Sequence, residues 1–244
     1  RGHKIELLAE KATFEEVAYL LIYGKLPTQT ELDAYKSKLK SLRDLPTELK
    51  VVLQNIPASA HPMDVMRTGT SMLGNLEPEG DFENQLDSIN RMTATMASIV
   101  TYWYKYSHEG VDISLVNDED TIAGHFLHIL HGKPPSELHK KVMDTSLILY
   151  AEHEFNASTF TARVCASTMS DIFSCVVAAI GSLRGPLHGG ANEAAMDMIE
   201  NWKTRDEAKS NILSMLQNKE KIMGFGHAVY SEVDPRNAVI KEYS

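Results

Sequence analysis

Helical periodicity is the feature that most constrains the fold of this chain. Apolar residues recur at steps of three and four along most of its 244 residues, which is the spacing of one buried face of an α-helix. Segment 13–27 is typical. Thr13 and Glu16 stand at capping-box spacing, apolar residues follow, and Gly24 and Pro27 mark the end. We therefore expect helices to dominate the structure.

The same pattern predicts further helices in ranges 61–76, 87–110, 118–135, 136–156, 167–185, 191–203 and 204–220. Residues 77–85 are polar and rich in turn formers, so we expect a mobile loop there. The one short candidate for a β-strand is 111–116. The predicted fold class is all-α, with a domain boundary near His188, where proline and glycine cluster.

Composition narrows the classes of function. The formal net charge of −9 disfavours nucleic acid as the main partner. No apolar run approaches the roughly 20 residues that a membrane span needs, so we expect no membrane partner. Cys165 and Cys175 lie in apolar helical surroundings and suggest reduced thiols rather than a disulfide framework. Together with the lack of a recognisable secretory signal, this favours a cytoplasmic location.

Three histidines, His125, His128 and His131, are spaced so that neighbours share one helix face. Imidazole is a common metal ligand, and a metal-dependent hydrolase is one alternative function. The segment has no H-E-x-x-H spacing and no nearby cysteine. We therefore expect no metal site and interpret these rings as packing groups.

Three other histidines lie where a helix ends or the chain turns: His153 in "AEHEFNAST", His188 in "RGPLHGGANEA" and His227 in "GFGHAVYSEVDPRN". Glycine, asparagine or serine beside each lets the backbone approach a ligand closely. With Arg236, they suggest one site assembled by folding. Two imidazoles could polarise two carbonyl groups, and an arginine could bind a carboxylate through two hydrogen bonds.

These three motifs, in this order, resemble the citrate synthase family. The opening "RGHKIELLAE" and the segment "TFEEVAYLLIYGKLP" also resemble that family, and "YAEHEFNASTF", "HPMDVMRTG" and "YWYKYSH" are most similar to its 2-methylcitrate synthase branch. The resemblance implies a helical homodimer with two domains around a cleft, and the apolar helix 171–183 would suit its interface. It also implies a Claisen-type condensation of oxaloacetate with propionyl-CoA or acetyl-CoA, followed by thioester hydrolysis. The acyl-CoA would be a substrate, and no cofactor is implied.

The resemblance assigns roles residue by residue. His188 matches the histidine that polarises the thioester carbonyl, and His227 matches the one that polarises the oxaloacetate ketone and protonates the new alkoxide. His153 and Arg236 match oxaloacetate-binding residues. A loop along coenzyme A matches Lys221, Ile222, Met223, Gly224 and Phe225. The break at Gly189 and Gly190 then has a reason, because it points an imidazole into the cleft and leaves room for acyl-CoA.

Some family features have no match in these residues. The resemblance places a proton-abstracting aspartate and two further arginines after the "DPR" motif, and Asp234 belongs to that motif itself. The first residues also look like the middle of an element. We therefore expect a fragment, inactive on its own, with a large domain in 1–188 that lacks its N-terminal part and the start of an incomplete small domain in 189–244.

Two substitutions bear on specificity. Tyr150 stands where many citrate synthases carry another histidine, which favours the methylcitrate branch. Ala228 stands where many members have an arginine, so one cation near the ligand is lost. Two other interpretations stay open: a citrate synthase that prefers acetyl-CoA, and a non-catalytic helical scaffold.

Overall fold

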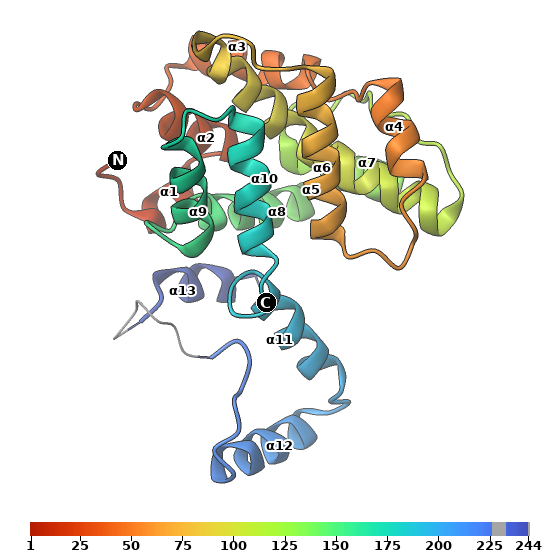
Figure 1. The fold of residues 1–244 in the computed structure, drawn as a ribbon. Coiled ribbons are helices and arrows are strands. Elements are labelled where there is room, and N and C mark those ends of the chain that lie inside the picture. The colour runs from red at the N-terminus through yellow and green to blue at the C-terminus, as the bar shows by residue number, and fades with distance from the viewer. Residues whose placement is uncertain (226–232, 244) are drawn as a thin grey trace.

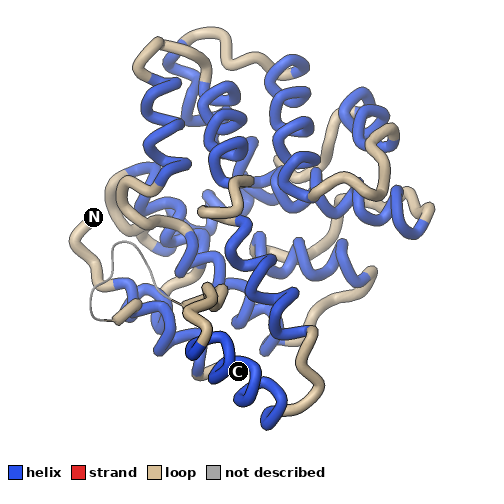
Figure 2. The backbone as a smooth tube through the Cα atoms, turned by 60° about the horizontal axis from the view of Figure 1, so that its bottom comes forward, coloured by secondary structure: helices blue, strands red, loops and turns tan. Residues whose placement is uncertain are grey.

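The computed structural model describes residues 1–225 and 233–243, which form helices and turns without a β-strand (Figures 1 and 2). Along the chain, the elements are α1 (Ile5–Lys11), α2 (Phe14–Tyr23), α3 (Gln29–Ser41), α4 (Thr47–Gln54), α5 (Pro62–Leu76), the 3-10 helix η1 (Phe82–Asn84), α6 (Gln85–Glu109), α7 (Ile122–His131), α8 (Glu137–Tyr150), α9 (Ala157–Ala166), α10 (Ile172–Leu183), α11 (Gly190–Glu200), α12 (Arg205–Gln217) and α13 (Pro235–Lys241). The predicted all-α class is confirmed.

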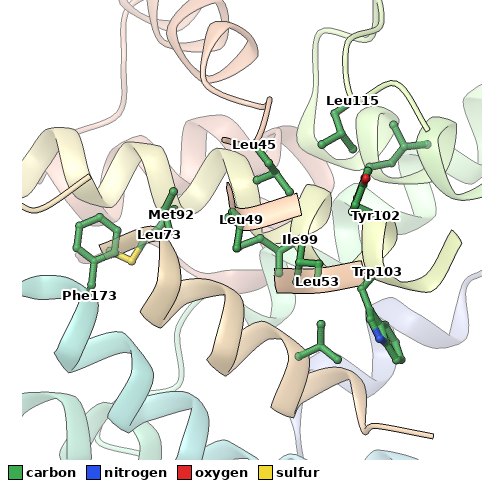
Figure 3. Packing of buried hydrophobic residues seen from close by; sticks show 12 residues of the cluster. Leu45, Leu49, Leu53, Leu73, Met92, Ile99, Tyr102, Trp103, Leu115 and Phe173 are labelled. Atoms are coloured by element: carbon green, nitrogen blue, oxygen red, sulfur yellow. The ribbon is translucent and has the colours of Figure 1, made fainter. Parts of the chain in front are cut away.

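Helix α6 is the centre of the larger part of the molecule. It packs against α3, α4, α5, α7 and α10, and it buries residues around most of its circumference rather than along one stripe. Leu49, Leu53, Leu73, Ile99 and Trp103 are at most 2% exposed and meet in one cluster (Figure 3). Burial of each such side chain contributes about 1.5–3 kcal/mol to stability.

Local signals place many of the helix ends. The Thr13–Glu16 capping box forms in both directions, and Gly24 ends α2 in the left-handed conformation. Gly110 and Gly132 end α6 and α7 in the same way. Ser136 caps α8 by accepting a hydrogen bond from the His139 backbone N–H. These ends agree with the sequence because capping depends on residues within one turn.

Some predicted elements are wrong. Residues 111–116 form no strand; the chain runs past the core and buries Leu115, and no neighbouring strand pairs with it. Helix α8 stops at Tyr150 rather than at residue 156. The segment predicted as one helix, 167–185, begins as a turn, and its helix starts only after Asp171 caps it. The predicted ranges also left out α3, α4, α9 and α13.

The chain after Gly189 differs from the part before it. Helices α11 and α12 contain no fully buried side chain, and they extend away from the main group of helices (Figure 1). Helix α13 returns to pack against α1, where Val239 contacts the apolar cluster of α1, α2 and α8. The domain boundary near residue 188 stays a prediction. No helix among the described residues is long and apolar enough to cross a membrane.

Candidate active site

The turn between α8 and α9 positions His153. Glu154 adopts a left-handed conformation (φ 51°), and its backbone N–H donates to the Glu152 carboxylate. Asn156 then caps α9 by accepting a hydrogen bond from the Thr159 N–H at 3.0 Å. The reversal turns the chain within a few residues and leaves the half-buried His153 lining a cavity.

That cavity, of about 320 Å³, brings His153 together with Arg236, 83 positions later in the sequence (236 − 153). Arg1 and His3 also line it, so cationic or potentially cationic groups come from three separate segments. Its remaining lining comes from apolar residues of α1, α2 and α8, from Ala151 and Pro235, and from two acidic residues, Glu152 and Glu154. Guanidinium groups in a cavity with many apolar lining residues suit a small dicarboxylate.

Arg236 is held in a defined orientation. Asp234 caps α13 by accepting from the Arg236 backbone N–H at 3.0 Å. The same carboxylate accepts from the Arg236 side chain, with Nε at 3.0 Å and a terminal nitrogen at 2.6 Å. The guanidinium carbon lies 5.9 Å from the centroid of the Tyr150 ring. The Asp-Pro-Arg sequence thus fixes one guanidinium group in the cavity that His153 also lines.

His188 lies in the turn that follows α10. Its backbone N–H donates to the Gly185 carbonyl at 2.9 Å, and its ring Nε2 lies 2.9 Å from the Ser158 hydroxyl. Ser158 also donates to Asn156 Oδ1 at 2.7 Å, so α9 orients the ring. A Cβ on Gly189 would lie 2.6 Å from the Leu183 carbonyl oxygen. The turn therefore requires glycine immediately after the histidine.

The loop predicted to follow coenzyme A lies against α11. Gly224 has φ +85°, and a Cβ there would lie 3.3 Å from the Ala195 side chain. Ile222 and Met223 are half-buried, whereas Lys221 is exposed and Phe225 is 71% exposed. His227 lies outside the described residues.

Comparison with known proteins gives a consistent result. Residues 1–244 match the family described as citrate synthase, C-terminal domain. The chain is 64% identical over 244 residues to 2-methylcitrate synthase of Shewanella oneidensis and 43% identical over 246 aligned residues to citrate synthase of Deinococcus radiodurans. Each alignment covers 100% of this chain and 65% of the relative.

Solved structures that match this chain are also citrate synthases. Citrate synthase of Thermotoga maritima matches with a TM-score of 0.85 at 38% identity, covering 99% of this chain and 64% of that one. A ternary complex of Thermoplasma acidophilum citrate synthase with carboxymethyl coenzyme A and oxaloacetate matches with a TM-score of 0.90 at 30% identity, with the same coverage. The chain belongs to the citrate synthase family. It spans about 65% of the length of the curated relatives that it matches.

Within this family fold, the structure brings some predicted site residues together and leaves others apart. His153 and Arg236 share one cavity. His188 does not line that cavity, but it contacts Ser158, which follows His153 by five positions. The 221–225 loop lies farther along, on α11. Participation of all these residues in one catalytic site stays a prediction.

Several neighbours were not found by sequence reasoning. Ser158 and Asn156 orient His188, and the only local signal was the Asn-x-Ser pattern typical of a helix start. His3 is exposed and also lines the cavity, for which no sequence motif gave a signal. His61 caps α5, with its Nδ1 accepting from the Met63 N–H at 3.1 Å, and its Nε2 also bonds Glu193 of α11 at 2.9 Å.

One of the three histidines of α7, His125, has a structural explanation. His125 is fully buried, with Nε2 3.1 Å from the Ser98 hydroxyl and Nδ1 2.9 Å from the Asn117 amide nitrogen. Burial, together with the positive charge of Arg43 and the neighbouring His128, lowers the pKa of His125 to about 3. Both ring nitrogens are therefore engaged in a neutral packing network. Among the described residues, no group of three or more His, Cys, Asp or Glu side chains is placed to hold a metal ion.

Proposed function

We propose that the protein condenses oxaloacetate with an acyl-CoA, propionyl-CoA before acetyl-CoA, and hydrolyses the thioester to release 2-methylcitrate or citrate and free coenzyme A. The main support is the cavity that joins His153 and Arg236, in a chain 64% identical to a 2-methylcitrate synthase. Arg236 would bind a carboxylate of oxaloacetate through two hydrogen bonds, and His153 would donate a third.

His188 would act on the other substrate. Removing a proton next to a thioester develops negative charge on the carbonyl oxygen. A fixed hydrogen-bond donor at that oxygen lowers such a barrier by roughly 3 kcal/mol. The Ser158 hydroxyl and the Gly185 carbonyl already fix the His188 side chain and backbone. His227 would polarise the ketone of oxaloacetate and then protonate the alkoxide. The 221–225 loop would bind coenzyme A, which enters as part of the acyl substrate, so no further cofactor is needed.

The choice between the two acyl groups depends on one methylene, which is worth only about 1–3 kcal/mol of discrimination. Tyr150 is the residue of this chain that we connect with the choice, because its ring centroid lies 5.9 Å from the Arg236 guanidinium carbon. We propose mixed specificity with a preference for propionyl-CoA.

Three further expectations belong to this proposal. The protein would act as a homodimer, with the apolar face of α10 a candidate for the interface. It would act in the cytoplasm. A protein of these 244 residues by themselves would bind oxaloacetate without turnover, and an assay of a protein of that extent tests this last point.

The deciding experiment is release of coenzyme A by the purified full-length protein in the presence of oxaloacetate and either acyl-CoA. We expect turnover with both, a higher kcat/KM for propionyl-CoA, and a loss of about 100-fold or more in kcat for His188→Ala. His153→Ala should abolish micromolar oxaloacetate binding. His139→Ala, on the exposed side of α8, is the matched control and should change neither. A full-length protein that binds oxaloacetate but turns over neither acyl-CoA would instead support the scaffold interpretation.

A further inference from the structure

The backbone around His188 is a tightly hydrogen-bonded unit. Two N–H groups donate to the Gly185 carbonyl oxygen, that of His188 at 2.9 Å and that of Gly190 at 3.3 Å. The Ala191 N–H donates to the His188 carbonyl at 3.1 Å, so the first turn of α11 is bonded directly to the histidine. A contact that holds the chain on either side of this unit therefore also affects the orientation of His188.

The N-terminal end of α5 contacts the chain on both sides of His188. On one side, Arg184, the C-cap of α10, places its Nε 3.4 Å from Asp64 in the first turn of α5. On the other side, His61, the N-cap of α5, places its Nε2 2.9 Å from the carboxylate of Glu193 in the first turn of α11. One end of one helix thus holds both segments that flank the histidine.

The cap of α5 fixes which ring nitrogen of His61 faces Glu193. His61 Nδ1 accepts a hydrogen bond from the Met63 N–H at 3.1 Å, so this nitrogen carries no proton while the cap is formed. The proton of the neutral ring is then on Nε2, which donates to the Glu193 carboxylate. This hydrogen bond lowers the pKa of Glu193, so the acceptor is ionised near neutral pH. The His61 side chain is only 16% exposed, so it is a donor of fixed direction.

We propose that the N-terminal end of α5 is a positioning element for His188, in which His61 and Asp64 hold the flanking segments through Glu193 and Arg184. This role rests on the proposed action of His188 at the thioester carbonyl. Ion pairs between partly exposed groups contribute little to stability. Catalysis is more sensitive, because a misplacement of about 1 Å can cost roughly 100-fold in rate. The contacts should therefore affect kcat while leaving the protein folded.

His61→Asn separates the cap of α5 from the contact with α11. Asparagine is among the best N-cap residues, so α5 keeps its cap, but its shorter side chain has no atom at the position of Nε2. We expect His61→Asn and Glu193→Ala each to lower kcat with acyl-CoA by about two- to fivefold. The KM for oxaloacetate should change little, since neither residue lines the His153–Arg236 cavity. The double variant should lose no more than either single variant, because both changes break one contact.

Arg184 is the residue to change on the other side, because Asp64 also binds Arg67 at 3.1 Å. Arg184→Met should lower kcat by a similar factor, and Arg184→Lys, which keeps a cation on a side chain of comparable length, should restore most of it. Asp197→Ala is the matched control for Glu193→Ala. Asp197 is acidic, exposed and one turn farther along α11, and its replacement should leave the kinetics unchanged.

Hydrogen exchange tests the same contacts without catalysis. In the full-length protein, amides of residues 185–191 should exchange at least about threefold faster in Glu193→Ala and in Arg184→Met than in wild type. Amides of α6 should be unaffected in both variants, and Asp197→Ala should match wild type throughout.

Kinetics and exchange together decide the outcome. Wild-type kcat in His61→Asn, Glu193→Ala or Arg184→Met would overturn the proposal. Independent effects of His61→Asn and Glu193→Ala would also overturn it, since Glu193 would then act without His61. A wild-type protein that turns over neither acyl-CoA would instead overturn the proposed function. Exchange alone then decides whether α5 holds the segment: faster exchange in 185–191 supports this and unchanged exchange overturns it.

Discussion

At the scale of single residues, one hydroxyl group controls the orientation of His188. Ser158 holds the ring from α9, while the His188 backbone belongs to the turn after α10. A side chain held from two separate elements keeps its orientation when a substrate binds. The entropic cost of reaching the reactive geometry is then lower.

We predict that Ser158→Ala lowers kcat/KM for acyl-CoA condensation by about five- to tenfold, because a hydrogen bond of about 1 kcal/mol that orients His188 is lost. The KM for oxaloacetate should change little, since Ser158 does not line the His153–Arg236 cavity. Thr161→Ala is the control: Thr161 lies on the same helix, is half-buried, and bonds only the Ala157 carbonyl. Equal kinetics for the two variants would contradict the orienting role.

A second residue-scale prediction concerns acid stability. Burial lowers the folded-state pKa of His125 to about 3, whereas its ordinary value is 6.5. Between these values, the unfolded chain binds a proton that the folded chain does not. The contribution of His125 to the free energy of unfolding is therefore complete above about pH 6.5. This free energy falls by up to about 1.4 kcal/mol per pH unit as pH decreases toward 3.

Urea unfolding between pH 7 and pH 4.5 tests this prediction. His125→Gln should be less stable than wild type at pH 7, because the Ser98 and Asn117 contacts are disturbed, but it should lose less stability on acidification. His139→Gln, at an exposed position of α8, should keep the wild-type slope. Parallel slopes for all three proteins would show that His125 does not dominate the acid response.

At the scale of elements, glycines decide how closely helices approach. Gly69 of α5 faces α6 so tightly that a Cβ would lie 2.5 Å from the Ile99 Cγ2. Gly181 of α10 has no heavy atom within 4 Å of the same position. Substitution of these two helical glycines should therefore have opposite effects on stability.

We predict that Gly69→Ala destabilises the protein by about 1–3 kcal/mol, because the new methyl group forces α5 and α6 apart. Gly181→Ala should be neutral or stabilising by up to about 1 kcal/mol, since alanine has the better helix propensity. Chemical denaturation of both variants measures the difference. A stable Gly69→Ala protein would mean that α5 and α6 separate at little cost.

The same scale shows what the sequence could predict. Thr13, Ser136, Gly24, Gly110 and Gly132 mark helix ends correctly because capping is local. Helix α9 was missed because its threonines and its few apolar residues give no clear stripe, and α9 buries no residue completely. Residues 111–116 alternate like a strand, but alternation alone cannot supply a pairing partner.

The site could be predicted only in part for a related reason. Motif resemblance identified His153 and Arg236, and the fold brings them into one cavity. The contacts that orient site residues join positions far apart in the sequence or depend on side-chain rotamers. Ser158 contacts His188 thirty positions away, and His61 contacts Glu193 across 132 positions. Such pairs depend on how helices pack, which a single sequence does not specify.

At the scale of the whole molecule, stability is unevenly distributed. The helices around α6 share a continuous core, whereas α11 and α12 bury no side chain completely. A polar contact connects the start of this second part to the cap of α5, between His61 Nε2 and Glu193 at 2.9 Å. The Glu193 side chain is exposed, so this contact does not hold the two parts together strongly.

Hydrogen exchange should therefore separate the two parts. We predict that amides of α12 exchange through local opening at low free energy, whereas those in the middle of α6 exchange only on global unfolding, at least about 100-fold more slowly. Oxaloacetate should slow exchange in 151–156 and in α13, which flank the His153–Arg236 cavity, and should leave α4 unchanged. Mass spectrometry of the full-length protein with and without oxaloacetate measures both effects. Uniform protection of α6 and α12 would contradict the uneven core, and protection of α4 rather than α13 would place the ligand elsewhere.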